Sequence, residues 1–209
     1  MIRITNVEVE GWRAALRGMR NPLNSWDRAD SKFDDGIEIG ENDLSLAKRL
    51  NKAGPDHSKF MRMITVSMDI EAPLYWWKEY DTYKVGTVAN SCSTMHKIHE
   101  RSLTLNDFSH EHLDQTSLEV LGKLIRWLNE CRYSFVTKQD KADWWQMIQL
   151  LPSSYNQKRT VLVNYAVLQK MYHARKNHKL DEWREFCKTI ENLPYARDLI
   201  VGEEPNAAT

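Results

Sequence analysis

The stretch "MITVSMDIEAPLYWWKEYDTYK", residues 63–84, carries the clearest structural signal in the chain. Its first part alternates apolar and polar side chains, which is typical of a strand buried on one face. Pro73 then separates this strand from an aromatic-rich segment, residues 74–84, that we interpret as a helix. The apolar face of the strand carries Ile64, Val66, Met68 and Ile70, and the other face carries Thr65, Ser67 and Asp69.

The rest of the chain mixes strands and helices in no regular order. Alternation predicts further strands at residues 2–10 and 158–165, and residues 24–40 form a long polar loop. Because no regular strand–helix–strand rhythm is present, the order favours an α+β fold. We expect a single domain over residues 1–201 and a disordered tail at 202–209. Helical spacing predicts helices at residues 12–19, 44–54 (capped by Asn42 and Asp43), 116–131, 140–151, 164–176 and 181–193.

The composition excludes some classes of partner. The 209 residues include 29 Lys and Arg and 29 Asp and Glu, so the formal net charge is zero. Proteins that bind long nucleic acids usually carry a basic excess, so we expect no such partner. The three cysteines lie far apart without a CxxC pair, which predicts a reducing compartment. Since no apolar run has the length of a membrane span or a signal peptide, we expect a cytoplasmic protein without a membrane partner.

A polar stretch, residues 78–97, reads "KEYDTYKVGTVANSCSTMHK". Hydroxyl groups and backbone N–H groups with positive charge beside them suit a phosphate. The same composition is also typical of a polar surface loop, and the stretch lacks the glycines of a P-loop. The candidate phosphate-contacting residues are Thr87, Asn90, Ser91, Ser93 and Thr94, with Lys84, His96 and Lys97 as nearby cations.

Two other kinds of chemistry compete for this stretch. Cys92 would be a nucleophile if His96 lowered its pKa, and His96 with His99 has the spacing of one zinc-ligand pair. A lone cysteine more often packs, and no second ligand pair has the spacing of a zinc site. We therefore expect no metal and name no catalytic residue.

The helix predicted at 164–176 places Arg175 at the end of its apolar side. At about 100° per residue, Asn164, Leu168, Met171 and Arg175 lie within one stripe. An arginine among inward-facing residues needs an acid or a phosphate as its partner. Alternatively, its stem follows the apolar surface and its charge interacts with the end of the helix dipole.

The order of these pieces resembles the flavin-dependent thymidylate synthases, the ThyX family, over residues 42–190. "LAKRLNKAGPDHSKF" stands where the family has a helix followed by Gly-His, a hydroxyl residue, Pro and Phe. "APLYWWKEYDTYK" stands where it has Pro, an apolar helix, a Gln and an Arg-His-Arg triplet. "TVANSCST" corresponds to Ser, Asn-Glu, a second Ser and an Arg, and "NYAVLQKMYHARKNHKLDEW" to Asn-x-Arg, an apolar helix and an Arg.

The resemblance implies roles for individual residues. Arg175 falls on an arginine that helps to hold the nucleotide, and Ser93 falls on the serine next to the substrate phosphate. The implied cofactor-binding residues are His57, Ser58 and Asn164. The implied substrate-binding residues are Glu79, Tyr83, Lys84, Asn90, Ser91, Ser93, His96 and Arg175.

Several cations of the family are missing from this chain. Thr82 and Tyr83 replace the first Arg and the His of the triplet, and Met95 replaces the phosphate-binding Arg. Ala166 and Ile148 stand where two further arginines belong. Because flavin carries a pyrophosphate, these losses weaken the usual flavin-binding contacts.

The resemblance also implies an architecture and a reaction. The architecture is a mixed sheet with flanking helices, assembling as a homotetramer whose sites are shared between subunits. The reaction is transfer of a one-carbon unit to C5 of dUMP or a related pyrimidine nucleotide, with FAD, NADPH and methylenetetrahydrofolate. The lost triplet favours a second hypothesis, a non-catalytic protein that senses or sequesters a nucleotide. The third hypothesis is a structural or protein-interaction module, which needs no pocket.

Overall fold

The strands of the computed structural model, which describes residues 1–202, form one antiparallel sheet. Tyr165 N donates to Ile64 O (3.0 Å), and Leu74 N donates to Tyr155 O (3.0 Å). Residue numbers therefore increase along one strand while they decrease along its neighbour, which is the antiparallel arrangement. The α+β class is confirmed, and the sheet is antiparallel where we expected a mixed one. In the order β1-β2-β4-β3, the strands are β1 (Arg3–Glu10), β2 (Thr65–Pro73), β3 (Thr87–Ser91) and β4 (Asn156–Asn164).

The helices follow the predicted apolar spacing with shifts at their ends. Asp114 and Asp140 act as N-caps by accepting hydrogen bonds from Ser117 N (2.8 Å) and Ala142 N (2.9 Å). The helices are α1 (Trp12–Arg20), α2 (Glu41–Lys52), α3 (Leu74–Tyr80), α4 (Thr94–Lys97), α5 (Gln115–Lys138), α6 (Lys141–Leu150), α7 (Tyr165–Arg175) and α8 (Asp181–Glu191). Of the predicted tail, residues 203–209 lie outside the described residues.

The described chain forms two compact units, and each strand contributes residues to both. We call them unit 1 and unit 2. Unit 1 comprises residues 1–3, 70–82 and 90–160, and unit 2 comprises residues 4–69, 83–89 and 161 onward.

The predicted alternation on β2 is confirmed. Its apolar positions are fully enclosed, whereas the intervening polar positions are half-buried, as expected of a strand that packs on one face. The enclosed side chains are Ile64, Val66, Met68 and Ile70.

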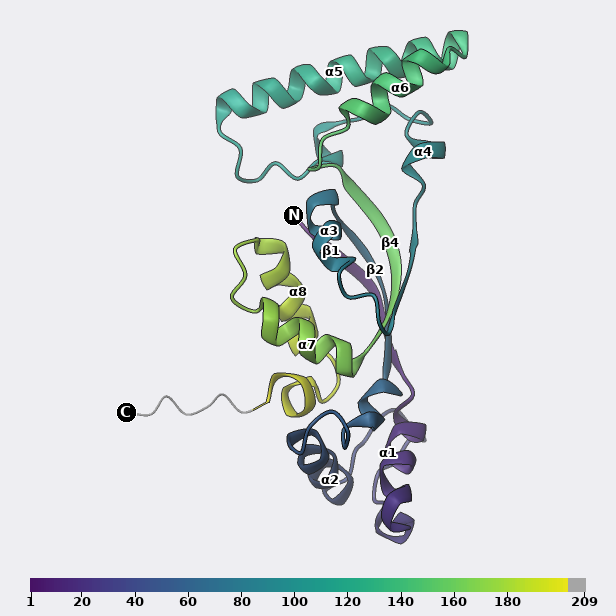
Figure 1. Ribbon diagram of the computed structural model, residues 1–209, viewed down its shortest axis with the longest axis vertical. Helices are drawn as coiled ribbons and strands as arrows, with labels where there is room; N and C mark the ends of the chain where they lie inside the picture. The colour runs from purple at the N-terminus through teal and green to yellow at the C-terminus, as the bar shows by residue number, and fades with distance from the viewer. Residues whose placement is uncertain (203–209) are drawn as a thin grey trace, which may run out of the picture. The chain divides into compact units, whose positions relative to one another are not determined.

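Unit 1 has an aromatic cluster and a helical core. Trp76 and Trp77 are buried with ring centroids 4.9 Å apart. Trp144 packs against the core partly buried, whereas Trp145 is exposed. Helices α5 and α6 lie side by side (Figure 1). The helical core consists of Ile98, Leu103, Phe108, Leu121, Ile125, Leu128, Cys131 and Met147.

Unit 2 is built around α1, α7 and α8. Trp12 meets Tyr165 edge-on, with ring centroids 5.3 Å apart. Leu168 and Met171 are completely buried on α7, and Trp183 and Phe186 are completely buried on α8. Figure 1 shows α7 and α8 as neighbours.

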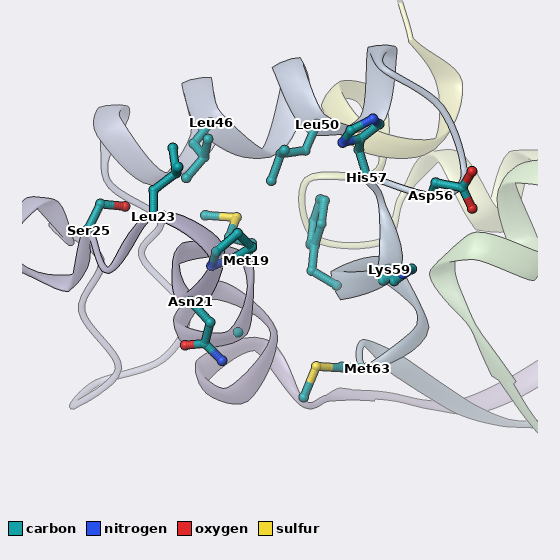
Figure 2. Close-up of a pocket in the computed structure, with 13 residues that line it drawn as sticks. Met19, Asn21, Leu23, Ser25, Leu46, Leu50, Asp56, His57, Lys59 and Met63 are labelled. Atoms are coloured by element: carbon teal, nitrogen blue, oxygen red, sulfur yellow. The ribbon is translucent and has the colours of Figure 1, made fainter.

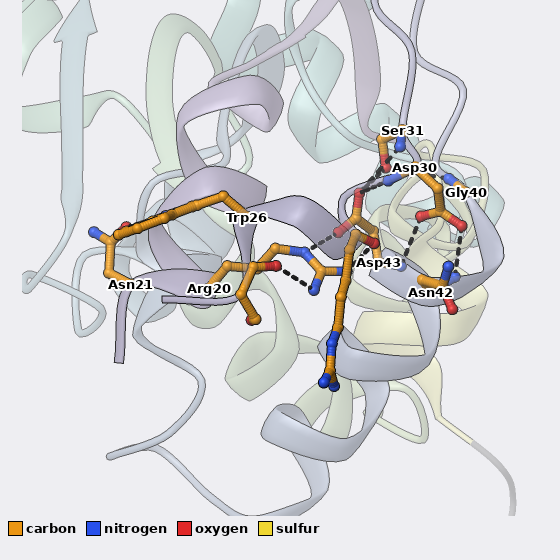
Figure 3. Close-up of polar contacts among 10 residues, drawn as sticks. Arg20, Asn21, Trp26, Asp30, Ser31, Gly40, Asn42 and Asp43 are labelled. Carbon is orange, nitrogen blue, oxygen red and sulfur yellow. Dashed lines mark hydrogen bonds and ion pairs between the residues drawn. The ribbon is translucent and has the colours of Figure 1, made fainter. Parts of the chain in front are cut away.

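The start of α2 differs from the prediction that Asn42 and Asp43 cap it. The carboxylate of Asp30 accepts from Asn42 N (2.8 Å) and Asp43 N (3.0 Å), so a residue of the preceding loop supplies the cap. Asp43 instead forms a buried ion pair with Arg20 at 2.6 Å. Figure 3 shows both carboxylates at the helix start.

The polar stretch at 78–97 is more ordered than a loop. Helix α3 ends at Tyr80, earlier than predicted, and β3 and α4 follow within the stretch. The side chains of β3 are half-buried or exposed, so no apolar alternation marks this strand in the sequence.

Candidate functional site

In unit 2, the structure brings together Arg175 and Tyr83, two residues that the sequence assigns to a substrate site. Arg175 Nε donates to the Tyr83 hydroxyl oxygen at 3.0 Å, across 92 positions of the chain. The guanidinium carbon lies 4.9 Å from the ring centroid of Trp183 and 5.7 Å from that of Tyr83. Stacking on an aromatic face fixes the plane of the guanidinium group. Arg175 is half-buried.

The segment that carries Tyr83 and Lys84 also reaches the other end of α7. Gly86 has a φ of +81°, and a side chain there would meet Asn164 Nδ2 at 2.9 Å. Asn164 caps α7 by accepting a hydrogen bond from Val167 N at 3.0 Å. Tyr83 and Gly86 therefore contact opposite ends of one helix, and Lys84 is exposed between them.

Four of the predicted phosphate-contacting residues lie in unit 1, at the end of β3 and the start of α4, whereas Thr87 begins β3 in unit 2. Asn90, Ser91 and His96 are exposed, whereas Ser93 is half-buried. Ser93 caps α4 by accepting from His96 N at 3.2 Å. A hydroxyl that accepts in this way still has its proton to donate to an anion. Glu79 is half-buried in α3.

The loop before α4 is held by two residues of β4 that the sequence analysis missed, Gln157 and Arg159. Gln157 Nε2 donates to Cys92 O at 3.1 Å and to Thr94 Oγ1 at 3.3 Å. Arg159 Nε donates to Gln157 Oε1 at 3.0 Å. A signal was present: Gln157 and Arg159 alternate in step with Val161 and Val163, which are 1% exposed, so all four belong to one face of β4.

Arg159 itself is supported by its neighbours in unit 1. Its Nη1 pairs with Asp81 Oδ1 at 2.8 Å, and its guanidinium carbon lies 4.2 Å from the ring centroid of Trp77. Burial and the nearby Asp81 raise the pKa of Tyr80 in the same cluster, so this phenol stays neutral at physiological pH.

Of the three residues expected to bind a cofactor, His57 lines an apolar cavity of unit 2 that Ser58 and Asn164 do not line. His57 lies at the rim of an apolar cavity of about 610 Å³ in unit 2, beside Asp56 and Lys59 (Figure 2). Ser58 is buried, and Asn164 is not among the residues of that cavity. The cavity is lined by Gly18, Met19, Asn21, Pro22, Leu23, Ser25, Leu46, Leu50, Asp56, His57, Lys59, Phe60 and Met63.

Metal-binding clusters and membrane-spanning helices are both absent from the described residues. Among residues 1–202, no group of three or more His, Cys, Asp or Glu side chains is placed to hold a metal ion. None of the described helices combines the length and the apolar character needed to cross a membrane.

No protein-family model and no curated protein sequence matches the chain, but solved structures match its fold. One is flavin-dependent thymidylate synthase ThyX from Helicobacter pylori complexed with FAD and dUMP. Its TM-score is 0.67 at 18% identity, covering 94% of this chain and 98% of that chain. Another, Thymidylate Synthase X (ThyX) from the same organism with FAD and dUMP, has a TM-score of 0.69 at 17% identity, covering 96% and 97%. At such identity the likeness establishes the fold alone, and the ThyX-like fold expected from the sequence is confirmed.

Proposed function

We propose that this chain binds a pyrimidine nucleotide of the dUMP type and that Arg175 holds its phosphate. The observation that carries the proposal is the contact between Arg175 and Tyr83 at 3.0 Å. The family resemblance assigns both residues to a substrate site, and the helical stripe separately predicts that Arg175 lies on the inward side of its helix. The fold, shared with ThyX structures that contain dUMP, supports the same ligand class.

The arrangement around Arg175 suits a phosphate chemically. A guanidinium group recognises phosphate through a planar fork of donors, and the plane must be fixed for the fork to be effective. The rings of Trp183 and Tyr83 supply that support, and the Tyr83 hydroxyl oxygen accepts the hydrogen bond from Arg175 Nε. Exposed Lys84 adds positive charge on the same segment.

We further propose substrate roles for the predicted residues of unit 1. Ser91, Ser93, Asn90 and His96 offer donors to the nucleotide, and the Glu79 carboxylate accepts from the base. These roles rest on the family resemblance and on the polar, accessible character of β3 and α4.

The experiment is calorimetric titration of dUMP into the wild type, Arg175→Ala and Arg175→Lys. Hydrogen bonds to charged groups contribute about 1.5–3 kcal/mol, so Arg175→Ala should weaken binding roughly tenfold to a hundredfold. Arg175→Lys should also weaken it, because the charge remains but the planar fork is lost.

Arg49→Ala is the matched control for this titration, since Arg49 is an exposed arginine in the last turn of α2. It should leave the affinity unchanged. If both Arg175 variants bound dUMP as tightly as the wild type, the phosphate role would be refuted and the helix-dipole interpretation would stand.

Two functions are compatible with nucleotide binding. The first is one-carbon transfer to C5 of the nucleotide, with FAD, NADPH and methylenetetrahydrofolate, which the fold supports. Because His57 lines a cavity that Ser58 and Asn164 do not line, we derive no step through flavin. The second is binding without catalysis, which is favoured by Tyr83 at a position where the family has a cation, with its hydroxyl already bonded to Arg175.

Thermal melting with dUMP and with FAD separates these two functions. A ligand at about a hundred times its Kd adds roughly 2.7 kcal/mol to the free energy of unfolding, which is a visible shift. Stabilisation by both ligands supports the enzyme, and stabilisation by dUMP alone supports the binding protein. Stabilisation by neither supports a structural or interaction module.

We also propose that the chain assembles as a homotetramer. Helix α5 exposes apolar side chains that a single chain does not cover, among them Val120, Trp127 and Tyr133. Analytical ultracentrifugation should find a tetramer, and Trp127→Glu should dissociate it. A stable wild-type monomer that still binds dUMP would refute the shared-site assembly.

A further inference from the structure

Arg159 occupies an unusual position for an arginine, on the inward side of a strand. Its side chain is 14% exposed, and it follows the same face of β4 as the buried Val161 and Val163. Burying a guanidinium group is costly unless its donors find partners. Here Asp81 supplies a counter-charge, Trp77 supplies a stacking surface, and Gln157 supplies an acceptor.

The bond from Arg159 determines which way the Gln157 amide points. Arginine can only donate hydrogen bonds, so the amide oxygen of Gln157 must face it. The amide NH₂ group then faces the opposite way, where it donates to Cys92 O and Thr94 Oγ1. With the amide reversed, its oxygen would face the Cys92 carbonyl oxygen and its NH₂ group would face the Arg159 donor, so the contacts with Cys92 and with Arg159 would both be lost.

Ser93 lies between the two residues that Gln157 contacts. Its hydroxyl oxygen accepts from His96 N and starts α4. One amide group therefore contacts both neighbours of Ser93, the backbone carbonyl of Cys92 and the side-chain hydroxyl of Thr94. In addition, Cys92 N donates to Lys158 O at 2.9 Å. The Gln157 contacts therefore flank the residue whose hydroxyl caps α4.

We infer that Arg159 is a positioning residue, which orients Gln157 and through it fixes residues 92–94 in the conformation that receives the nucleotide. The inference rests on the proposed function, because it assigns this loop to the nucleotide. Arg159 acts through Gln157 and makes no contact with the ligand itself.

A double-mutant cycle tests whether Arg159 acts through Gln157, a connection that we call the relay. Calorimetry with dUMP is performed on Arg159→Met, Gln157→Met and the double variant, all of which remove hydrogen bonds without adding charge. Each single variant should weaken binding about tenfold. If Arg159 acts only through Gln157, the double variant is also about tenfold weaker, whereas independent contacts would multiply to about a hundredfold. A hundredfold loss in the double variant would overturn the relay.

Gln169→Met is the matched control for the Gln157 substitution. Gln169 also donates to a backbone carbonyl and a side-chain oxygen, Leu199 O (3.0 Å) and Asn51 Oδ1 (3.1 Å), but it lies on α7. Its loss should lower the melting temperature without changing dUMP affinity. An equal loss of affinity in Gln169→Met would overturn the positioning role, because general destabilisation would then explain both results.

The reactivity of Cys92 reports on the loop without any ligand. Cys92 is exposed, whereas Cys131 and Cys187 are buried, so a thiol reagent reads this loop selectively in the folded protein. Arg159→Met and Gln157→Met should both accelerate modification of Cys92. Unchanged rates alongside normal dUMP binding would overturn the relay and leave the proposed function intact. Faster rates in a protein whose wild type binds no dUMP would overturn the proposed function instead.

Discussion

Two arginine–aspartate pairs, one in each unit, differ in how completely they are enclosed. In unit 2, the side chains of Arg20 and Asp43 are 3% and 2% exposed. In unit 1, those of Arg159 and Asp81 are 14% and 51% exposed. The distances are similar, 2.6 Å and 2.8 Å, so the difference lies in the surroundings of the charges.

The enclosed pair holds a loop. Arg20 Nη1 and Nη2 donate to Ser25 O (3.1 Å) and Arg28 O (3.0 Å), and Asp43 Oδ2 accepts from Ser31 Oγ at 2.6 Å. These bonds hold the loop between α1 and α2 within unit 2 (Figure 3). Charges that are fully removed from water need such a complete set of partners.

The open pair instead orients another side chain. About half of the Asp81 side chain is exposed to solvent, and Arg159 Nε donates a hydrogen bond to Gln157. We therefore expect the enclosed pair to contribute mainly to the stability of the fold and the open pair mainly to the conformation of the loop before α4. The same substitution, Asp→Asn, made in each pair can test this distinction.

The largest effect is expected for Asp43→Asn, which leaves the Arg20 guanidinium buried without its counter-charge. Removing one member of a buried pair costs about 3–5 kcal/mol of the free energy of unfolding. Urea denaturation followed by fluorescence measures this loss. The double variant Arg20→Met with Asp43→Leu should not regain this loss in full, because Ser25 O, Arg28 O and Ser31 N would lose their hydrogen-bond partners. A loss below about 1 kcal/mol in Asp43→Asn would mean that the pair behaves like a surface pair.

A smaller effect is expected from acid. Burial alone would raise the pKa of Asp43, but hydrogen bonds from Ser31 and Arg20 outweigh it and hold the pKa below the ordinary value of 3.8. The folded state therefore favours the ionised form. This contribution to stability is fully present above pH 3.8 and is lost as pH falls through the lower pKa of the folded state.

Denaturation of the wild type and Asp43→Asn as a function of pH isolates this contribution. The difference in unfolding free energy between them should be constant above pH 5 and should shrink below pH 3.8. A difference that stays constant down to pH 2 would contradict the lowered pKa.

The fold could be predicted largely from the sequence because burial leaves periodic signals. The alternation on β2 and the helical stripe on α7 both mark side chains that pack against a core. Strand β3 left no such signal, since its side chains are half-buried or exposed and its pairing with β4 uses the backbone. The cap of α2 was misassigned because Asp30 reaches the helix start from the loop, which no local pattern records.

The candidate site was predicted in part, for a related reason. Arg175 was found because it extends an apolar helical stripe, and its contact with Tyr83 then joined two predicted residues. Arg159 was missed because Lys158 and Arg159 read as ordinary charges of a polar strand start. Its partner Asp81 lies 78 positions earlier, so only tertiary structure brings them together.

The smallest effect is expected for Asp81→Asn, the counterpart of Asp43→Asn in the open pair. Because Asp81 is half exposed, water already screens its charge, and such pairs contribute about 1 kcal/mol or less. The free energy of unfolding should therefore fall by less than about 1 kcal/mol, and the loss should shrink further in high salt.

The loop before α4 should also be little affected by this substitution. The asparagine oxygen can still accept from Arg159 Nη1, and Trp77 still supports the guanidinium group, so the Gln157 amide should keep its orientation. We expect unchanged Cys92 reactivity and a change in dUMP affinity of less than about threefold. Urea denaturation at two salt concentrations, with Asp43→Asn measured in parallel, provides the comparison. A loss in Asp81→Asn as large as that in Asp43→Asn would show that exposure does not separate the two pairs and that Asp81 is part of the core of unit 1.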